Sequence, residues 1–160
     1  MIPKVRSFLL QGIDAQPVEI EVDFDDTQLQ KEIVVGLPDA AVKESLERVR
    51  SAMANTGYPM PAGRTLINLA PADVKKEGPM YDLPIAVGVL LASAVIHPAR
   101  TPARRPVHMG GGELSFDDES TGLDPRRALI AGELALDGRI RPIRGVIAMV
   151  SLAREMGLDA

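Results

Sequence analysis

The segment Leu83–Ala94 constrains the fold more than any other part of the chain, because it is apolar on almost every side. Asp82 before it is suited to cap a helix, and Pro84 is suited to the first turn. A helix that is hydrophobic all round is either buried or membrane-spanning, and this segment is shorter than the roughly 20 residues that a bilayer requires. We therefore expect a helix at the centre of the domain, with the other elements packed around it.

Segments with strand patterns precede this helix. Val5–Leu10 is a short apolar run, and the residues from Val18 to Phe24 alternate between apolar and acidic, as in a half-buried strand. Glu32–Gly36 is rich in β-branched residues. Three strands so close in sequence predict a meander. A fourth strand is expected at Arg64–Leu69.

Two further helices and a hairpin are expected. Asp39 is a helix cap, followed by an apolar stripe of Val42, Leu46, Val49 and Met53 and by a stop at Gly57. Asp137-Gly138 predicts a hairpin between Ala128–Leu134 and Arg139–Ile143. A last helix should end at Gly157, with Val146, Val150 and Ala153 along one face. We therefore expect the α+β fold class.

Composition limits the possible functions. The chain has 160 residues, enough for a single well-buried domain. It contains no Cys, which excludes disulfides, thiolate metal sites and Cys nucleophiles, and only two His, so we expect no metal site. The net charge of −4 argues against attraction of the whole surface to nucleic acid or anionic lipid. With no signal-peptide pattern and no membrane-spanning segment, the chain is expected to be cytoplasmic and free of membrane partners.

Two features concern the domain boundaries. His97–Arg127 changes in character, with prolines and arginines followed by an acidic stretch, and is interpreted as a surface insertion. Within it, Gly112–Asp118 (GELSFDD) echoes Gly132–Gly138 (GELALDG), either by duplication of a hairpin edge or by chance. The apolar Leu158 after the last helix suggests a further strand, so we expect residues 1–160 to be a truncated fragment of a longer protein.

The stretch Asn68–Ala86 (NLAPADVKKEGPMYDLPIA) joins a predicted strand to the central helix through a Lys-Lys-Glu-Gly-Pro turn, an exposed corner of the kind that carries active sites. Asp73, Glu77 and Asp82 cluster there and are candidates for carboxylate catalysis. The simpler interpretation is that Asp82 caps a helix, while Asp73 and Glu77 lie in solvent beside Lys75 and Lys76. A hydrolase with an unrecognised site is the least favoured function.

Other catalytic patterns are absent. The chain has no G-x-x-x-x-G-K-[ST] phosphate loop, so it should not hydrolyse ATP by itself, and no cofactor is expected. A Ser–Lys pair would need an exposed serine and a positioned lysine base. The serines of the predicted elements, which are Ser7, Ser45, Ser51 and Ser93, do not lie on exposed Gly-flanked turns, and the last helix contains no lysine.

Four blocks of sequence, in order, are similar to the amino-terminal region of the magnesium-chelatase-like AAA+ ATPases of the ComM/YifB type, a bacterial family. They are KVRSFLLQGIDA, IVVGLPDAAVKESLERVRSA, NLAPADVKKEGPMYDLPIAVGVL and GELALDGRIRPIRGV. The resemblance covers nearly the whole chain outside His97–Arg127. It implies a ribosomal protein S5 domain 2-like fold, a mixed sheet with helices packed on it, as in the proteolytic domain of Lon and the carboxy-terminal domain of RadA.

The resemblance also identifies two positions where proteolytic groups are lost. In Lon-type proteases the corresponding corner carries a nucleophilic serine after Lys-Asp-Gly-Pro, and here Met80 stands at the serine position. The base lysine of those proteases follows a Pro-Ile-Gly-Gly turn, and here Ile147 stands at the lysine position after Pro142-Ile143-Arg144-Gly145. A thioether cannot attack a carbonyl and an alkyl chain cannot accept a proton. The resemblance therefore implies a domain that is not an enzyme.

Two functions remain open. The first is a non-catalytic assembly or scaffold domain, since the resemblance implies a hexameric ring, a downstream AAA+ motor that binds ATP and Mg²⁺, and a role in DNA branch migration and natural transformation. The second is a module that contacts DNA or another partner through basic residues near the corner and the last turn. Its candidate residues are Lys75, Lys76, Arg64, Arg139, Arg141 and Arg144.

Overall fold

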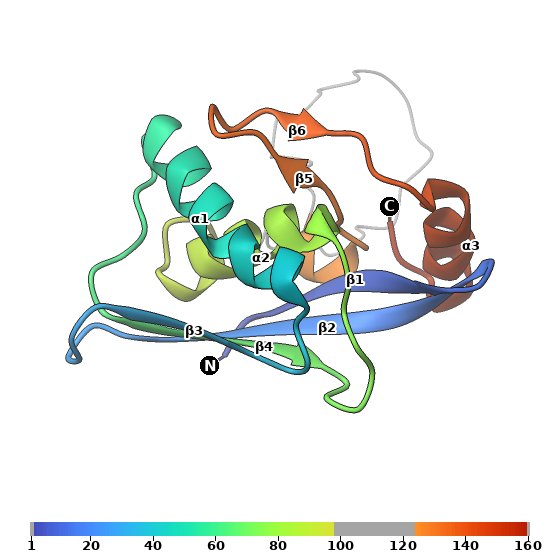
Figure 1. Cartoon of the computed structure of the whole chain (residues 1–160), viewed down its shortest axis with the longest axis horizontal. Coiled ribbons are helices and arrows are strands. Elements are labelled where there is room, and N and C mark those ends of the chain that lie inside the picture. The colour runs from blue at the N-terminus through green and yellow to red at the C-terminus, as the bar shows by residue number, and fades with distance from the viewer. Residues whose placement is uncertain (1, 98–123, 160) are drawn as a thin grey trace, which may run out of the picture.

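A computed structural model of the chain describes residues 2–97 and 124–159. Figure 1 labels the helices and strands of the described residues. In chain order, with η for a 3-10 helix, they are β1 (Lys4–Gln11), β2 (Asp14–Asp25), β3 (Lys31–Val35), α1 (Ala40–Asn55), β4 (Arg64–Ala70), η1 (Pro79–Tyr81), α2 (Asp82–Ala92), η2 (Pro125–Arg127), β5 (Glu133–Leu134), β6 (Ile140–Arg141) and α3 (Val146–Met156). The predicted α+β class is confirmed.

The main sheet has the strand order β1-β2-β4-β3. The β1–β2 and β2–β4 pairs are antiparallel, whereas β3 runs parallel to β4. The predicted meander of the first three strands was therefore wrong, because β3 pairs with β4 and not with β2. The close contact at Gly36 fits this arrangement: a Cβ there would lie 2.1 Å from the carbonyl oxygen of Leu69, and its φ is +97°. Only glycine lets the chain leave β3 so close to β4.

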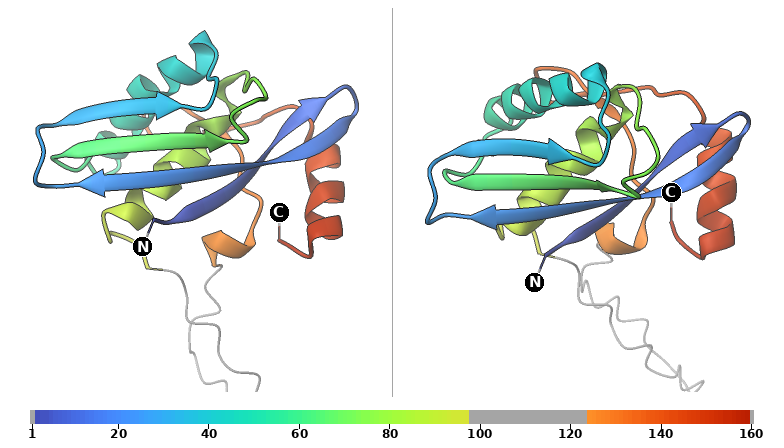
Figure 2. Two further views of the ribbon diagram at one scale, coloured as in Figure 1. Left: turned by 90° about the horizontal axis from the view of Figure 1, so that it is seen from below. Right: turned by 60° about the horizontal axis from the view of Figure 1, so that its bottom comes forward.

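Helices α1 and α2 cover one face of this sheet, and the other face carries no helix in the described residues (Figures 1 and 2). The prediction of a central helix is confirmed, because Ile85 and Val89 of α2 are buried against the sheet. At Gly88 an added Cβ would lie 2.7 Å from a Val22 methyl group, so α2 packs closely on β2.

Helix α1 follows its sequence pattern. The Asp39 side chain accepts a 2.7 Å hydrogen bond from the amide of Val42, which confirms the predicted cap. Val42, Val49 and Met53 are buried and Leu46 is partly buried against them. The amphipathic stripe therefore predicted the packed side of α1 correctly.

Helix α3 ends at Gly157, which adopts a left-handed conformation with φ of +65°, as predicted. Its predicted face is confirmed only in part, because Ala153 is buried together with Met149 and Leu152, while Val146 and Val150 are about half exposed. The reason is that the buried residues pack in a second, smaller cluster around Phe8 and Leu129. Apolar spacing along one helix cannot reveal which of two overlapping stripes meets such a cluster.

The predicted hairpin is confirmed as the short antiparallel pair β5–β6. Most of the expected insertion, and with it the echo at Gly112–Asp118, lies outside the described residues. In the residues that are described, no helix is long and apolar enough to cross a membrane.

Candidate functional site

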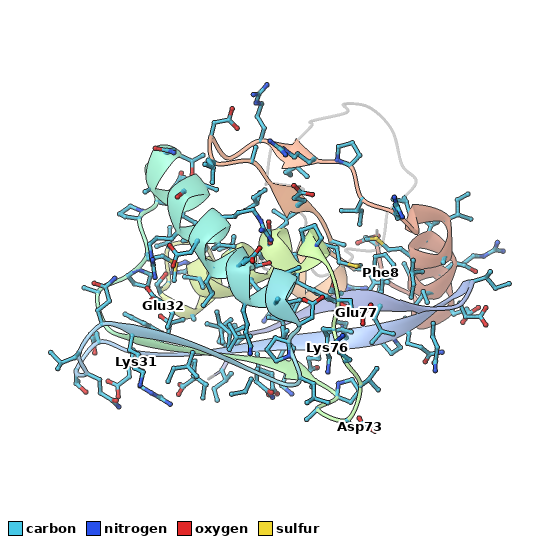
Figure 3. The ribbon with its side chains drawn as sticks, viewed as in Figure 1. Phe8, Lys31, Glu32, Asp73, Lys76 and Glu77 are labelled. Carbon is cyan, nitrogen blue, oxygen red and sulfur yellow. The ribbon has the colours of Figure 1, made fainter. Side chains whose placement is uncertain are left out.

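The loop between β4 and α2 is tied to the start of α1 by backbone hydrogen bonds. The amide of Lys76 donates to the carbonyl oxygen of Leu37, and the amide of Asp39 donates to the carbonyl oxygen of Lys76, both at 3.1 Å. The second carboxylate oxygen of Asp39 accepts from the amide of Gly78 at 3.3 Å. Asp39 therefore caps α1 and positions the corner, which Figure 3 marks with the side chains of Asp73, Lys76 and Glu77.

Gly78 gives the corner its shape, because its φ of +84° is a conformation that other residues rarely adopt. The chain then makes the short helix η1, which contains Met80. Met80 is partly buried and packs against both hydrophobic clusters of the domain. Its carbonyl oxygen accepts a 2.9 Å hydrogen bond from the amide of Gly132. The residue at the position of the protease serine thus joins the two clusters.

Asp82 was predicted to cap α2, and this was wrong. It is the first residue of the helix, is fully buried, and its carboxylate turns toward α1. Arg48 donates to both of its oxygens, at 2.7 and 3.0 Å, and the amide of Leu134 donates to one of them at 3.1 Å. The hydrogen bonds from Arg48 to Asp82 raise the pKa of the Arg48 guanidinium. The sequence pattern missed this pair, because a capping position does not reveal a partner 34 residues away.

Lys76 was predicted as a contact to DNA or a partner, but it does not have the exposed side chain that such a contact needs. Its side chain is fully buried and donates a hydrogen bond to the carbonyl oxygen of Pro71. Burial lowers the pKa of the Lys76 ammonium, and the nearby Asp73 opposes that change. The neighbouring Lys75 is exposed and pairs with Glu77 at 3.0 Å. The ammonium group that the corner presents to solvent is that of Lys75.

Tyr81 was missed by the sequence analysis. It is fully buried, and its hydroxyl has no hydrogen-bond partner among the described residues. Burial raises the pKa of this hydroxyl, and the charges of Asp39 and Glu77 raise it further. A tyrosine between Met80 and Asp82 carries no sequence signal that separates it from an ordinary core aromatic.

A cleft of about 640 Å³ opens at this corner. Arg144 from the last turn lines it together with Met80 and Tyr81, and its walls mix apolar and charged residues. They are Leu9, Leu10, Asp39, Ala41, Lys75, Glu77, Gly78, Pro79, Met80, Tyr81, Glu133, Pro142, Ile143 and Arg144. None of these residues is a serine or a histidine, so the cleft holds no Ser–His or Ser–Lys pair.

Ile147 lies elsewhere. It is 90% exposed and lines a second hollow, between the β1–β2 turn and α3, that does not include Met80. The two positions at which the resemblance places the catalytic groups of a protease thus line different hollows, which share Leu10 as a wall residue. Among the described residues, no group of three or more His, Asp or Glu side chains is placed to hold a metal ion.

The predicted basic residues are mostly paired with acids. Arg64 is the first residue of β4, Lys75 lies in the loop after its other end, and Arg139 and Arg141 lie on the β5–β6 hairpin. The ion pairs are Arg64–Asp23 at 3.7 Å, Lys75–Glu77 at 3.0 Å, Arg139–Asp137 at 2.8 Å and Arg141–Glu133 at 3.4 Å. Arg144 is exposed and has no ion pair within the described ranges.

Comparison with known proteins found relatives that match nearly the whole chain. The chain is 38% identical over 146 residues to the uncharacterized protein YifB of Salmonella typhimurium, covering 91% of this chain and 24% of YifB. It is 38% identical over 154 residues to an uncharacterized protein of Mycobacterium tuberculosis, covering 96% and 26%. It is 35% identical over 151 residues to the competence protein ComM of Haemophilus influenzae, covering 94% and 25%.

The chain thus spans about a quarter of the length of these curated relatives. The family profile described as "Subunit ChlI of Mg-chelatase" matches residues 20–123, which include β4, the corner and α2. Since that match covers more than half of the chain, this protein belongs to the family of the ChlI subunit of magnesium chelatase, together with YifB and ComM.

Proposed function

We propose that this chain is a non-catalytic assembly domain at the amino-terminal end of a ComM/YifB-type, magnesium-chelatase-like ATPase. In this proposal the domain helps to build or stabilise a ring, and the rest of the family protein supplies an AAA+ motor that binds ATP and Mg²⁺. The name of the competence protein ComM supports a role in natural transformation, and we include DNA branch migration in the proposal. We place the whole protein in the cytoplasm.

The environment of Met80 is the observation that carries this proposal. At the corner that would expose a nucleophile, Met80 instead fills the space between the two hydrophobic clusters. The carboxylates near Met80 make structural contacts: Asp82 accepts hydrogen bonds from Arg48, and Asp39 accepts them from backbone amides. A corner whose side chains hold the fold together supports a scaffold and not a catalyst.

The same features support a finer fold assignment. The mixed four-stranded sheet, the helices on one face and the corner before α2 are compatible with the proposed S5 domain 2-like fold. An experimental structure superposed on a Lon proteolytic domain tests this assignment. A different connection between β3, α1 and β4 would refute it.

The assembly role is tested in a full-length relative such as ComM. We expect deletion of the region equivalent to this chain to reduce the mass of the assembled particle in light scattering, while the motor region stays folded by circular dichroism. A particle of unchanged mass after deletion would refute the assembly role. The non-catalytic part is tested separately, by incubating this chain with fluorescent casein, where no cleavage above buffer is expected.

A DNA-contacting module remains the alternative, and the structure offers it less support. Four of its six candidate residues pair with carboxylates, and Lys76 is buried. Phosphate contacts by several free cations would make binding fall steeply with salt. Fluorescence anisotropy with single- and double-stranded DNA over a salt series distinguishes the two proposals. Tight binding at low salt that weakens in Lys75→Ala and Arg144→Ala would favour DNA contact.

A further inference from the structure

A hollow with both apolar and polar walls, the polar ones including Asp14 and Glu155, lies at one end of the sheet between the β1–β2 turn and α3. Its volume is about 630 Å³, and its walls include Leu10, Ile13 and Ile147. Ile13 and Ile147 are each 90% exposed, and Val150 on the same helix is about half exposed. Single exposed apolar residues are ordinary, but a group around a hollow marks a surface that binds another protein.

A second exposed apolar side chain lies at the other end of the sheet. Leu29 is 93% exposed in the loop that joins β2 to β3. Strand β2 runs the full distance between this loop and the β1–β2 turn (Figure 1). Its 12 residues span about 40 Å at roughly 3.3 Å per residue. Leu29 therefore cannot reach the hollow of its own chain.

The charges around the two ends are complementary. Lys31, two residues after Leu29, is exposed and has no ion pair in the described part of the chain, while Asp14 and Glu155 line the hollow without one. The loop also carries Asp26, and the exposed Arg154 of α3 offers that carboxylate a cation. Asp25 is already satisfied by hydrogen bonds from Thr27 and Gln28.

We propose that the Leu29 loop of one copy of this chain inserts into the Ile13–Ile147 hollow of the next copy. Such a contact joins two different surfaces, so it is heterologous: it adds copies head to tail and forms a ring if the rotation closes. The inference rests on the proposed assembly role and names the contact that performs it. Lys31 then faces Asp14 or Glu155, which favours this register over others.

The experiment is sedimentation of the whole chain over a concentration series. We expect the wild type to associate, and Leu29→Ser and Ile147→Ser each to weaken association by at least about tenfold, since each removes one large apolar side chain from the contact. Both side chains are exposed, so the variants should fold normally. Leu136→Ser is the matched control, because Leu136 is 57% exposed away from either end and should have no effect.

A mixture of the two variants makes the test specific. Leu29→Ser keeps an intact hollow and Ile147→Ser keeps an intact loop, so an equimolar mixture should form dimers and nothing larger. Wild-type chains that stay monomeric at the highest soluble concentration would overturn the inference. So would Leu29→Ser chains that associate like the wild type, although the assembly role would then stand. The deletion test in ComM decides the role independently of this contact.

Discussion

Arg48 and Asp82 form a two-pronged ion pair that joins the middle of α1 to the first residue of α2. The carboxylate is fully buried, whereas the guanidinium side chain keeps 24% of its surface exposed. Arg48 also donates to the hydroxyl of Ser45 and to the carbonyl oxygen of Ala41. The pair therefore ties together the two helices that cover the sheet.

Removing one partner of this pair should be strongly destabilising. We expect Arg48→Ala to lower the free energy of unfolding by about 3–5 kcal/mol, because it leaves the Asp82 charge buried without its cation. Urea unfolding measures this change. Glu47→Ala is the control, since the exposed pair of Glu47 with Arg50 should contribute less than about 1 kcal/mol. Equal effects of the two variants would contradict a buried structural pair.

Because Lys76 is buried, we expect its contribution to the free energy of unfolding to depend on pH. Because burial lowers its folded-state pKa below the ordinary 10.5, the unfolded chain binds more protons between those two values. The contribution of Lys76 to stability therefore rises as pH increases through that window. In urea unfolding, wild-type stability minus that of Lys76→Met should increase as the pH is raised toward about 10, the ordinary lysine pKa. If this stability difference did not change with pH, the pKa of Lys76 would be the same in the folded and the unfolded chain, which would contradict the prediction.

Tyr81→Phe should stabilise the protein by about 1 kcal/mol near neutral pH, because it removes a buried hydroxyl that has no partner among the described residues. The raised pKa of Tyr81 adds a test at high pH. Above about pH 10 the tyrosine ionises only in the unfolded chain, so wild-type stability should fall. That loss should be absent in Tyr81→Phe. The control is Tyr58→Phe, because Tyr58 is about half exposed. This variant should still lose stability at high pH, as the wild type does.

Introducing a serine at position 80 should not produce hydrolytic activity. Met80→Ser should leave fluorescent casein uncut, and so should the double variant Met80→Ser with Ile147→Lys, because residues 80 and 147 line different hollows. Met80→Ser should also cost about 1–3 kcal/mol of stability through lost packing between the two clusters. Ile147→Lys alone, at an exposed position, should leave stability nearly unchanged. Cleavage by the double variant would show that the two side chains meet.

Local patterns in the sequence were sufficient to predict most of the elements. The alternation from Val18 to Phe24 identified β2, and the cap at Asp39 with its apolar stripe identified α1. Gly157 identified the end of α3. These patterns succeed because strand pleating and helix capping depend on residues that are close in the chain.

What the sequence by itself determined was therefore the type and place of most elements and the centrality of α2. The absence of reacting groups at Met80 and Ile147 remains what the family resemblance implies. Only the tertiary structure decided that β3 pairs with β4, that Asp82 binds Arg48, and that Lys76 is buried. Each of these depends on contacts between residues distant in the chain. A lysine in a turn is exposed or buried according to which residues pack over it, and the residues next to it in the sequence do not indicate which of the two applies.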